Sequence, residues 1–302
     1  MLQAILLGFL VAEATLYVCL TRYLSERGVN NLAIAAIVLL LALVWRLSHA
    51  LGSFVVAGGL RWRDGRTLPW GNSMASLASE FAARFICFNW SQPFPALAVG
   101  PDPGGTKGGA PILLVHGYLC NRGLWVKFRR RLEDAGLGPI YTISFTPLFG
   151  GIDALVPELE ARIETICMET GAPKIMIVAH SMGGLVARAY LVQSRRARVG
   201  KLVTLGSPHH GSQLSRLAIG SNACQMRDQS EWIHTLEERE AADPGSDRRP
   251  RTLSIYTLND DLVYPPESSV LEWAENVPVS AIGHMGLVFS GPVAKRVIQY
   301  LR

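Results

Sequence analysis

Residues 177–184 read I-V-A-H-S-M-G-G, and the fold of the chain can be worked out from this stretch. A run of apolar residues leads into Ser181, and a helical pattern of apolar residues follows it. Ser181 is therefore expected on a sharp turn between a buried strand and a helix. Such a turn leaves no room for side chains just behind the serine, and Ala179 and Gly183 supply the small residues that it needs.

Short apolar runs alternate with helical patterns on both sides of this turn, from residue 111 onward. Six of these runs are interpreted as buried strands: residues 112–116, 140–145, 174–179, 201–205, 252–257 and 277–282. Between them, an apolar face over residues 152–166 predicts a helix that ends at Gly171. This alternation predicts an α/β fold with a mostly parallel sheet flanked by helices.

The predicted turn has consequences for the chemistry of Ser181. It would lift the hydroxyl above the edge of the sheet, where the N-terminus of the next helix points toward it. An oxyanion formed there would meet backbone N–H groups and the positive end of the helix dipole. Residues 179–183 therefore have the form of a nucleophile elbow, with Ala179 in place of the first glycine. The alternative is an ordinary helix cap, for which serine is also suited.

Four stretches together resemble the α/β-hydrolase fold and, within it, bacterial triacylglycerol lipases and related esterases. They are L-L-V-H-G-Y at 113–118, V-A-H-S-M-G-G-L-V-A-R at 178–188, T-L-G-S-P-H-H-G-S at 204–212 and N-D-D-L-V-Y-P at 259–265. The resemblance covers residues 111–302. The usual secreted form of the family lacks the apolar segments that open this chain.

The resemblance implies a nucleophile and an oxyanion hole. Ser181 is the expected nucleophile. The family places a second oxyanion donor just after an H-G pair at the end of an early strand, which here is His116-Gly117-Tyr118. The backbone N–H groups of Tyr118 and Met182 are therefore the expected oxyanion hole. The alternative for the first of these turns is a simple glycine turn after a strand.

The resemblance also implies a base and an acid, in the chain order serine, acid, histidine. His284 follows the strand at 277–282, where the histidine loop of the fold belongs, and is the expected base. Asp260 and Asp261 both follow the strand at 252–257 and both qualify by position. In the resembling enzymes the acid lies three residues before Val-x-Pro, which selects Asp260.

Three other reactive side chains lie close in sequence to these motifs. His209 and His210 precede the acid, and the matching lipase motif uses their turn to shape the floor of the site, so we expect structural roles. Cys120 follows the oxyanion turn but has no elbow geometry of its own, and a buried or rim position is the better interpretation. The expected mechanism requires no metal and no organic cofactor.

Composition excludes several other classes of protein. The five cysteines form no C-x-x-C pair, which argues against a disulfide framework or a zinc site. The net charge of +5 comes from scattered basic residues, without a nucleic-acid-binding signature. Solvated faces and attraction to anionic lipid explain this charge better than nucleic acid does.

The first sixty residues predict a membrane anchor of two helices. Residues 2–20 are apolar apart from Gln3, Glu13 and Thr15, and residues 28–45 carry no charge. Each segment approaches the roughly 20 residues of a membrane-spanning helix. The apolar side chains offset the cost of about 3 kcal/mol for an acid at mid-helix. A cleaved signal peptide is the alternative, but no positive start and no cleavage site support it.

The basic residues near the two segments predict an orientation. Two spans leave both ends of the chain on the same side of the membrane. Two arginines lie in the connecting loop and four follow the second segment: Arg22 and Arg27, against Arg46, Arg61, Arg63 and Arg66. We expect a multi-pass protein of the bacterial inner membrane. By the positive-inside rule, the larger number of arginines after the second segment weakly predicts a cytoplasmic catalytic domain.

The chain is expected to divide into three parts. Residues 1–60 form the anchor, residues 61–109 an amphipathic helix and a Pro/Gly-rich linker, and residues 110–302 the catalytic domain. The amphipathic helix has apolar residues at helical spacing and would lie on the membrane or pack on the core: Met74, Leu77, Phe81, Phe85 and Phe88. Residues 211–251 break the alternation and are expected to form a cap or lid.

These observations predict a membrane-anchored serine hydrolase that cleaves carboxylic esters, of lipids or acyl groups, through an acyl-enzyme on Ser181. An acyltransferase or a thioesterase would use the same residues with a different acceptor or leaving group. A non-catalytic membrane interaction module on the same scaffold is a third hypothesis. The expected partners are the membrane and a lipid or acyl-ester substrate.

Overall fold

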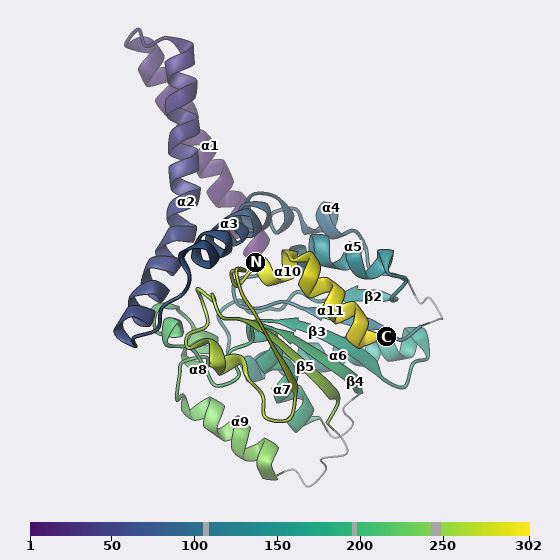
Figure 1. The fold of residues 1–302 in the computed structure, drawn as a ribbon. Helices are drawn as coiled ribbons and strands as arrows, with labels where there is room; N and C mark the ends of the chain where they lie inside the picture. Colours follow the sequence, from purple (N-terminus) through teal and green to yellow (C-terminus); the bar gives the residue numbers. More distant parts are fainter. Residues whose placement is uncertain (105–108, 195–197, 243–248) are drawn as a thin grey trace.

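A parallel sheet forms the centre of the structure (Figure 1). The computed structural model describes residues 1–104, 109–194, 198–242 and 249–302. Within these ranges the strand order is β2-β1-β3-β4-β5-β6, and all neighbours are parallel. The strands are β1 (Ile112–Val115), β2 (Ile140–Thr142), β3 (Ile175–His180), β4 (Val199–Leu205), β5 (Arg251–Thr257) and β6 (Glu275–Val279). The predicted α/β fold is confirmed.

Helices cover both faces of this sheet, and two long helices precede it (Figure 1). The α-helices are α1 (Leu2–Glu26), α2 (Asn31–Arg63), α3 (Trp70–Ile86), α4 (Pro95–Val99), α5 (Val126–Asp134), α6 (Ile152–Thr170), α7 (Met182–Gln193), α8 (Ser221–Gln225), α9 (Glu231–Ala242), α10 (Gly286–Phe289) and α11 (Gly291–Leu301). Helix α6 ends as predicted at Gly171, which has a φ of 73°.

A large hydrophobic core lies on each face of the sheet, because successive side chains of a strand point to opposite faces. Leu113 and Ile177 pack with α6 and α7 on one face. Leu114 and Val178 pack with α5 and α11 on the other. The central strands therefore have apolar side chains on both faces, which is the pattern that predicted a doubly covered parallel sheet.

Strand β6 ends earlier than expected. The apolar pattern predicted a strand to residue 282, but pairing stops at Val279. Ala281 has a φ of 60°, and its N–H donates to Asn259 Oδ1 at 2.9 Å. This turn directs the chain from the sheet toward His284.

The segment between β4 and β5 is an insertion of short helices. It holds a 3₁₀ turn, η3 (Gln213–Leu217), followed by α8 and α9. Helix α9 packs on α7 through Ile233 and Leu236. Residues 243–248 of the predicted lid lie outside the described residues, as do residues 105–108 of the predicted linker.

Helices α1 and α2 lie side by side and project away from the sheet (Figure 1). In the described part of the chain they are the helices long and apolar enough to cross a membrane, by length and composition. Glu13 of α1 accepts hydrogen bonds from Arg46 of α2 at 2.6 and 3.1 Å. Arg46 also donates to Asn89 in the π-helical turn η1 (Cys87–Ser91).

The C-terminal half of α2 packs on the rest of the protein. Ala57 is fully buried against Leu214 and Tyr264, and the Tyr264 hydroxyl donates to Asp64 at 2.8 Å. Helix α3 then crosses the loops at the end of the sheet. Its buried face consists of Ser76, Glu80 and Ala83, while the apolar Met74 and Phe85 remain about half exposed.

Candidate active site

The turns after β1 and β3 meet at the point where the chain reverses its direction across the sheet. After β1 the chain continues to β2 on one side, and after β3 it continues to β4 on the other. Such switch points are the usual ligand sites of open α/β sheets. A Cβ on Gly117 would lie 2.7 Å from the Ser181 Cβ and 2.9 Å from the His180 carbonyl oxygen. Gly117 is therefore required for the two turns to touch.

Ser181 has the backbone of a nucleophile elbow. Its φ of 55° and ψ of −128° are unusual for any residue other than glycine. The Ser181 N–H donates to the Leu205 carbonyl at 2.9 Å, which ties the turn to β4. A Cβ on Gly183 would lie 2.7 Å from the carbonyl oxygens of Val115 and His116. The small residue behind the serine is thus needed for the reason predicted.

The two predicted oxyanion donors lie on these adjacent turns. The Met182 amide opens α7, where an amide has no partner within the helix. Among the hydrogen bonds of the described residues, neither this amide nor that of Tyr118 has an acceptor. Both N–H groups are available to a ligand atom. The Tyr118 side chain instead donates from its hydroxyl to the Ile219 carbonyl at 2.7 Å.

His116 holds the first of these turns in place. Its Nδ1 donates to the Gly117 carbonyl at 2.9 Å, and its Nε2 accepts from the Phe145 N–H at 3.1 Å. Burial lowers the pKa of His116 to about 4. The ring is therefore neutral at pH 7, as these two contacts require.

Asp260 and His284 form a buried hydrogen-bonded pair. The Nδ1 of His284 donates to Asp260 Oδ2 at 2.9 Å, and both side chains are at most 2% exposed. The other oxygen, Asp260 Oδ1, accepts from the N–H groups of Leu262 and Val263 at 2.9 and 2.7 Å. Gly206, with a φ of 58°, leaves room for the imidazole, because a Cβ there would lie 3.2 Å from Nδ1.

The surroundings of His284 change its pKa. Burial lowers the pKa of an imidazole, but the charge and hydrogen bond of Asp260, followed by the charges of Glu80 and Asp261, outweigh burial. The pKa of His284 is raised above its ordinary value as a result. With its Nδ1 proton held by Asp260, the neutral ring presents Nε2 as an acceptor.

Asp261, the other candidate acid, does not contact the imidazole. Its Oδ1 accepts from the main-chain N–H of His284 at 3.2 Å. Its Oδ2 accepts from Ser53 of α2 and Arg84 of α3, each at 2.6 Å. Asp260 therefore orients the ring of His284, and Asp261 holds the backbone of the same residue.

His180, beside Ser181, was not predicted as a site residue from the sequence. The Nε2 of His180 donates to the His284 carbonyl at 3.2 Å, and the two rings lie 4.7 Å apart. Burial and then the charge of His284 keep the pKa of His180 well below its usual range. The sequence signal for His180 was its position next to Ser181. A residue at this position packs against the loop that carries His284.

The remaining reactive side chains have other contacts. His209 is buried, with its Nε2 3.1 Å from Thr204 Oγ1, and His210 pairs with Glu237 at 2.6 Å. Burial raises the pKa of the Cys120 thiol to about 12, so the thiolate is not formed at pH 7.

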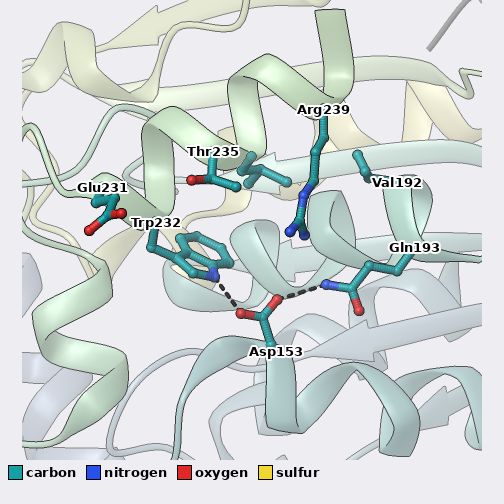
Figure 2. A pocket seen from close by; sticks show the side chains of 8 residues that line it. Asp153, Val192, Gln193, Glu231, Trp232, Thr235 and Arg239 are labelled. Atoms are coloured by element: carbon teal, nitrogen blue, oxygen red, sulfur yellow. Dashed lines mark hydrogen bonds between the residues drawn. The ribbon is translucent and has the colours of Figure 1, made fainter. Parts of the chain in front are cut away.

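A pocket of about 280 Å³ opens elsewhere, between α9 and the helices α6 and α7 (Figure 2). Asp153 accepts there from Trp232 Nε1 at 2.6 Å and from Gln193 at 2.7 Å. None of the described residues that line it is a predicted site residue. The predicted site residues Ser181 and Tyr118 lie instead on the turns after β3 and β1.

Parts of this chain are similar to known proteins. Residues 156–281 match the family model described as a PGAP1-like alpha/beta domain. The chain is 26% identical over 113 residues to a triacylglycerol lipase of Pseudarthrobacter phenanthrenivorans, covering 35% of each chain. It is 27% identical over 128 residues to the (lyso)-N-acylphosphatidylethanolamine lipase of Mus musculus, covering 39% of this chain and 35% of that one. The matches span about a third of these relatives.

Solved structures share the fold at low identity. A mature lipase of Bacillus licheniformis aligns with a TM-score of 0.57 and 18% identity, over 66% of this chain and 95% of that one. Lipase B of Aspergillus fumigatus aligns with a TM-score of 0.56 and 18% identity, over 65% and 53%. The chain therefore contains an α/β-hydrolase domain, PGAP1-like, with distant similarity to triacylglycerol lipases.

Proposed function

We propose that this protein is a membrane-anchored serine hydrolase that cleaves carboxylic esters of lipids or acyl groups. Two observations carry the proposal: Ser181 on its elbow lies against the Gly117 turn, and the buried pair of Asp260 and His284 contacts His180, the residue next to Ser181. These are the parts that acyl transfer to a serine requires. The similarity to lipases supports the same reaction class.

In the first step, the Ser181 hydroxyl attacks the ester carbonyl while His284 Nε2 takes the hydroxyl proton. Asp260 stays ionised and stabilises the imidazolium through the Nδ1 hydrogen bond. The carbonyl oxygen becomes an oxyanion and binds the N–H groups of Tyr118 and Met182. Each such donor contributes about a hundredfold to a thousandfold in rate.

In the second step, the tetrahedral intermediate collapses, and the bond to the leaving alcohol breaks as His284 returns the proton to that alcohol. The acyl group remains on Ser181 as an ester. Water then attacks this ester with His284 again as the base, which releases the acid and restores the serine. No step requires an electron acceptor or donor.

The two N-terminal helices support a substrate in the membrane. Their length and composition fit two spans. A domain held at the bilayer meets lipid esters at a raised local concentration. The triacylglycerol lipase and the (lyso)-N-acylphosphatidylethanolamine lipase are both named for lipid substrates, which supports a lipid or acyl ester as the substrate class here.

The test is labelling of the full-length protein in detergent with a fluorophosphonate probe. We expect labelling of the wild-type chain and none of Ser181→Ala. Hydrolysis of acyl esters of increasing chain length then gives the preferred substrate, and product analysis with added alcohol distinguishes hydrolysis from transfer to an alcohol. Absence of both labelling and hydrolysis in the folded wild type would reject the proposal.

The orientation in the membrane can be tested through Cys224, which is exposed on α8. In a Cys19→Ser background, a membrane-impermeant maleimide applied to intact bacterial cells should label Cys224 only after the cells are permeabilised. Labelling of intact cells would place the catalytic domain on the outer side instead.

A further inference from the structure

Side chains of α3 contact the loop that carries His284. Glu80 is fully buried, and its Oε2 accepts from the N–H groups of Met285 and Gly286 at 2.7 and 3.1 Å. The Gly283 N–H donates to Ser79 Oγ at 2.9 Å. The histidine loop is therefore bonded to α3 immediately before and immediately after His284.

Close packing makes this contact specific. A Cβ on Gly283 would lie 2.6 Å from the Glu80 side chain, and one on Gly286 would lie 2.8 Å from Ser79 Oγ. The loop thus has glycine at the two positions where it approaches α3 most closely. A shift of Glu80 would be transmitted to the loop, because no free space separates them.

Arg84 joins Glu80 to the acid loop. Its Nε donates to Glu80 Oε1 at 2.8 Å, and its Nη2 donates to Asp261 Oδ2 at 2.6 Å. Asp261 in turn accepts from the His284 N–H. The consecutive amides of residues 284, 285 and 286 are therefore all bonded to the carboxylates that Arg84 bridges.

Helix α2 contacts the same cluster from the other side. Ser53 donates to Asp261, and Arg61 donates to the main-chain carbonyl of Asp260. The groups that face the imidazole or its two acids come from α2, α3, β3 and the loop after β5: Arg61, Glu80, Arg84, His180, Asp260 and Asp261.

Buried carboxylates are costly, and this cost argues for a role beyond packing. Burial, followed by the charge of Asp261, raises the pKa of Glu80 to about 7, against the opposing charge of Arg84. A neutral side chain could accept the two loop amides without that cost. The charges of Glu80 and Asp261 also favour a protonated His284, which is the form that follows proton transfer from the nucleophile.

We propose that Glu80 and Arg84 are positioning residues for His284, so that α3 forms part of the active site although it touches neither the substrate nor the nucleophile. This inference rests on the proposed function. Supporting side chains of this kind set the geometry of a reacting group, and a misplacement of about 1 Å costs about a hundredfold in rate.

The test compares Glu80→Gln with Glu133→Gln in the full-length protein. Glu133 forms an Arg–Glu pair of the same spacing, with Arg129 on α5, so it serves as the matched control. For Glu80→Gln we expect kcat to fall about 10- to 100-fold with KM within about threefold of wild type, at an unchanged circular dichroism spectrum. We also expect the acidic limb of its pH profile to move to lower pH. Glu133→Gln should change neither.

A wild-type kcat and an unmoved acidic limb in folded Glu80→Gln would overturn the inference. If that variant does not fold, Arg84→Lys keeps the charge but lacks the separate Nε and Nη2 donors that bond to Glu80 and Asp261, and a wild-type kcat there would overturn the inference equally. If the wild-type chain has no activity, the proposed function fails first. Titration of His284 by NMR then tests the inference. A lower pKa of His284 in Glu80→Gln than in the wild type would support it, and an unchanged pKa would overturn it.

Discussion

Gly117 lies against the Cβ of Ser181, so closely that no side chain fits on Gly117. A Cβ placed on Gly117 would lie 2.7 Å from the Ser181 Cβ, which is closer than two such atoms approach in proteins. A side chain on Gly117 would therefore push the turn after β1 away from the turn that carries Ser181.

Gly117→Ala tests this contact. We expect the added methyl group to displace Tyr118 from the oxyanion position and to lower kcat about a hundredfold or more. The measurement is ester hydrolysis at saturating substrate. Gly200→Ala on β4 is the control, because its Cβ would meet nothing closer than 3.8 Å and should leave kcat unchanged. Full activity of Gly117→Ala would show that the two turns do not form one site.

Asp260→Asn should remove the charge that orients the imidazole, and turnover should fall up to about ten-thousandfold while the fold is kept. Asp261→Asn retains an oxygen that can accept from the His284 N–H, and we expect a smaller loss. The measurement is kcat of both variants and of the wild type in steady-state ester hydrolysis. The opposite ranking, with Asp261→Asn inactive and Asp260→Asn near normal, would exchange their roles.

The pH profile of kcat/KM should have an acidic limb set by His284. The base must be neutral, so the rate falls as pH is lowered through its pKa, which lies above the ordinary value of about 6.5. In Asp260→Asn the acidic limb should move to lower pH, because the variant lacks the charge that most strongly favours the protonated form of His284. An acidic limb well below pH 6 in the wild-type enzyme would contradict a raised pKa of His284.

Tyr118→Phe should retain kcat within about threefold, since the proposed donor is the backbone N–H and the hydroxyl binds the Ile219 carbonyl. The measurement is hydrolysis of a short, dispersed ester by the full-length protein. A loss of a hundredfold would instead assign the oxyanion contact to the side chain.

Arg46→Met should destabilise the protein in detergent, because it removes the charged partner of Glu13 and leaves the Tyr17 hydroxyl as its remaining donor. The double variant Glu13→Gln with Arg46→Met removes both charges and should recover much of the lost thermal stability. Melting curves of the two variants and wild type make the comparison. Equal stability of all three would mean that the pair contributes nothing to the packing of α1 on α2.

The fold could be predicted from the sequence because the central strands have apolar side chains on both faces and helices lie between successive strands from β1 to β5. The ends of the strands were less certain, as β6 shows: Val279 and Ile282 are both apolar, and only the turn at Ala281 separates strand from loop. Such a turn depends on the Asn259 side chain, a contact that no local pattern contains.

The candidate site was predictable to the extent that each residue belongs to a local motif, as Ser181 and Asp260 do. Glu80 and Arg84 were not, because they are polar residues on a helix whose apolar side alone formed a recognisable pattern. The apolar Phe85 remains exposed and the polar Glu80 is buried, which reverses the usual assignment of an amphipathic helix. Only the position of α3 against the histidine loop explains this reversal.

Arg46, which bonds both to Glu13 of α1 and to Asn89, sets how deep the protein would sit in a bilayer. Beyond Glu13, α1 continues for about 13 residues, or about 20 Å, whereas the hydrocarbon layer is about 30 Å thick. If the helices cross the membrane, the bilayer must also enclose the first half of α1 and the adjacent surface with Phe85 and Trp90, each about half exposed. The catalytic body would then be partly submerged in one leaflet, and a lipid could reach Ser181 by lateral diffusion without first entering water.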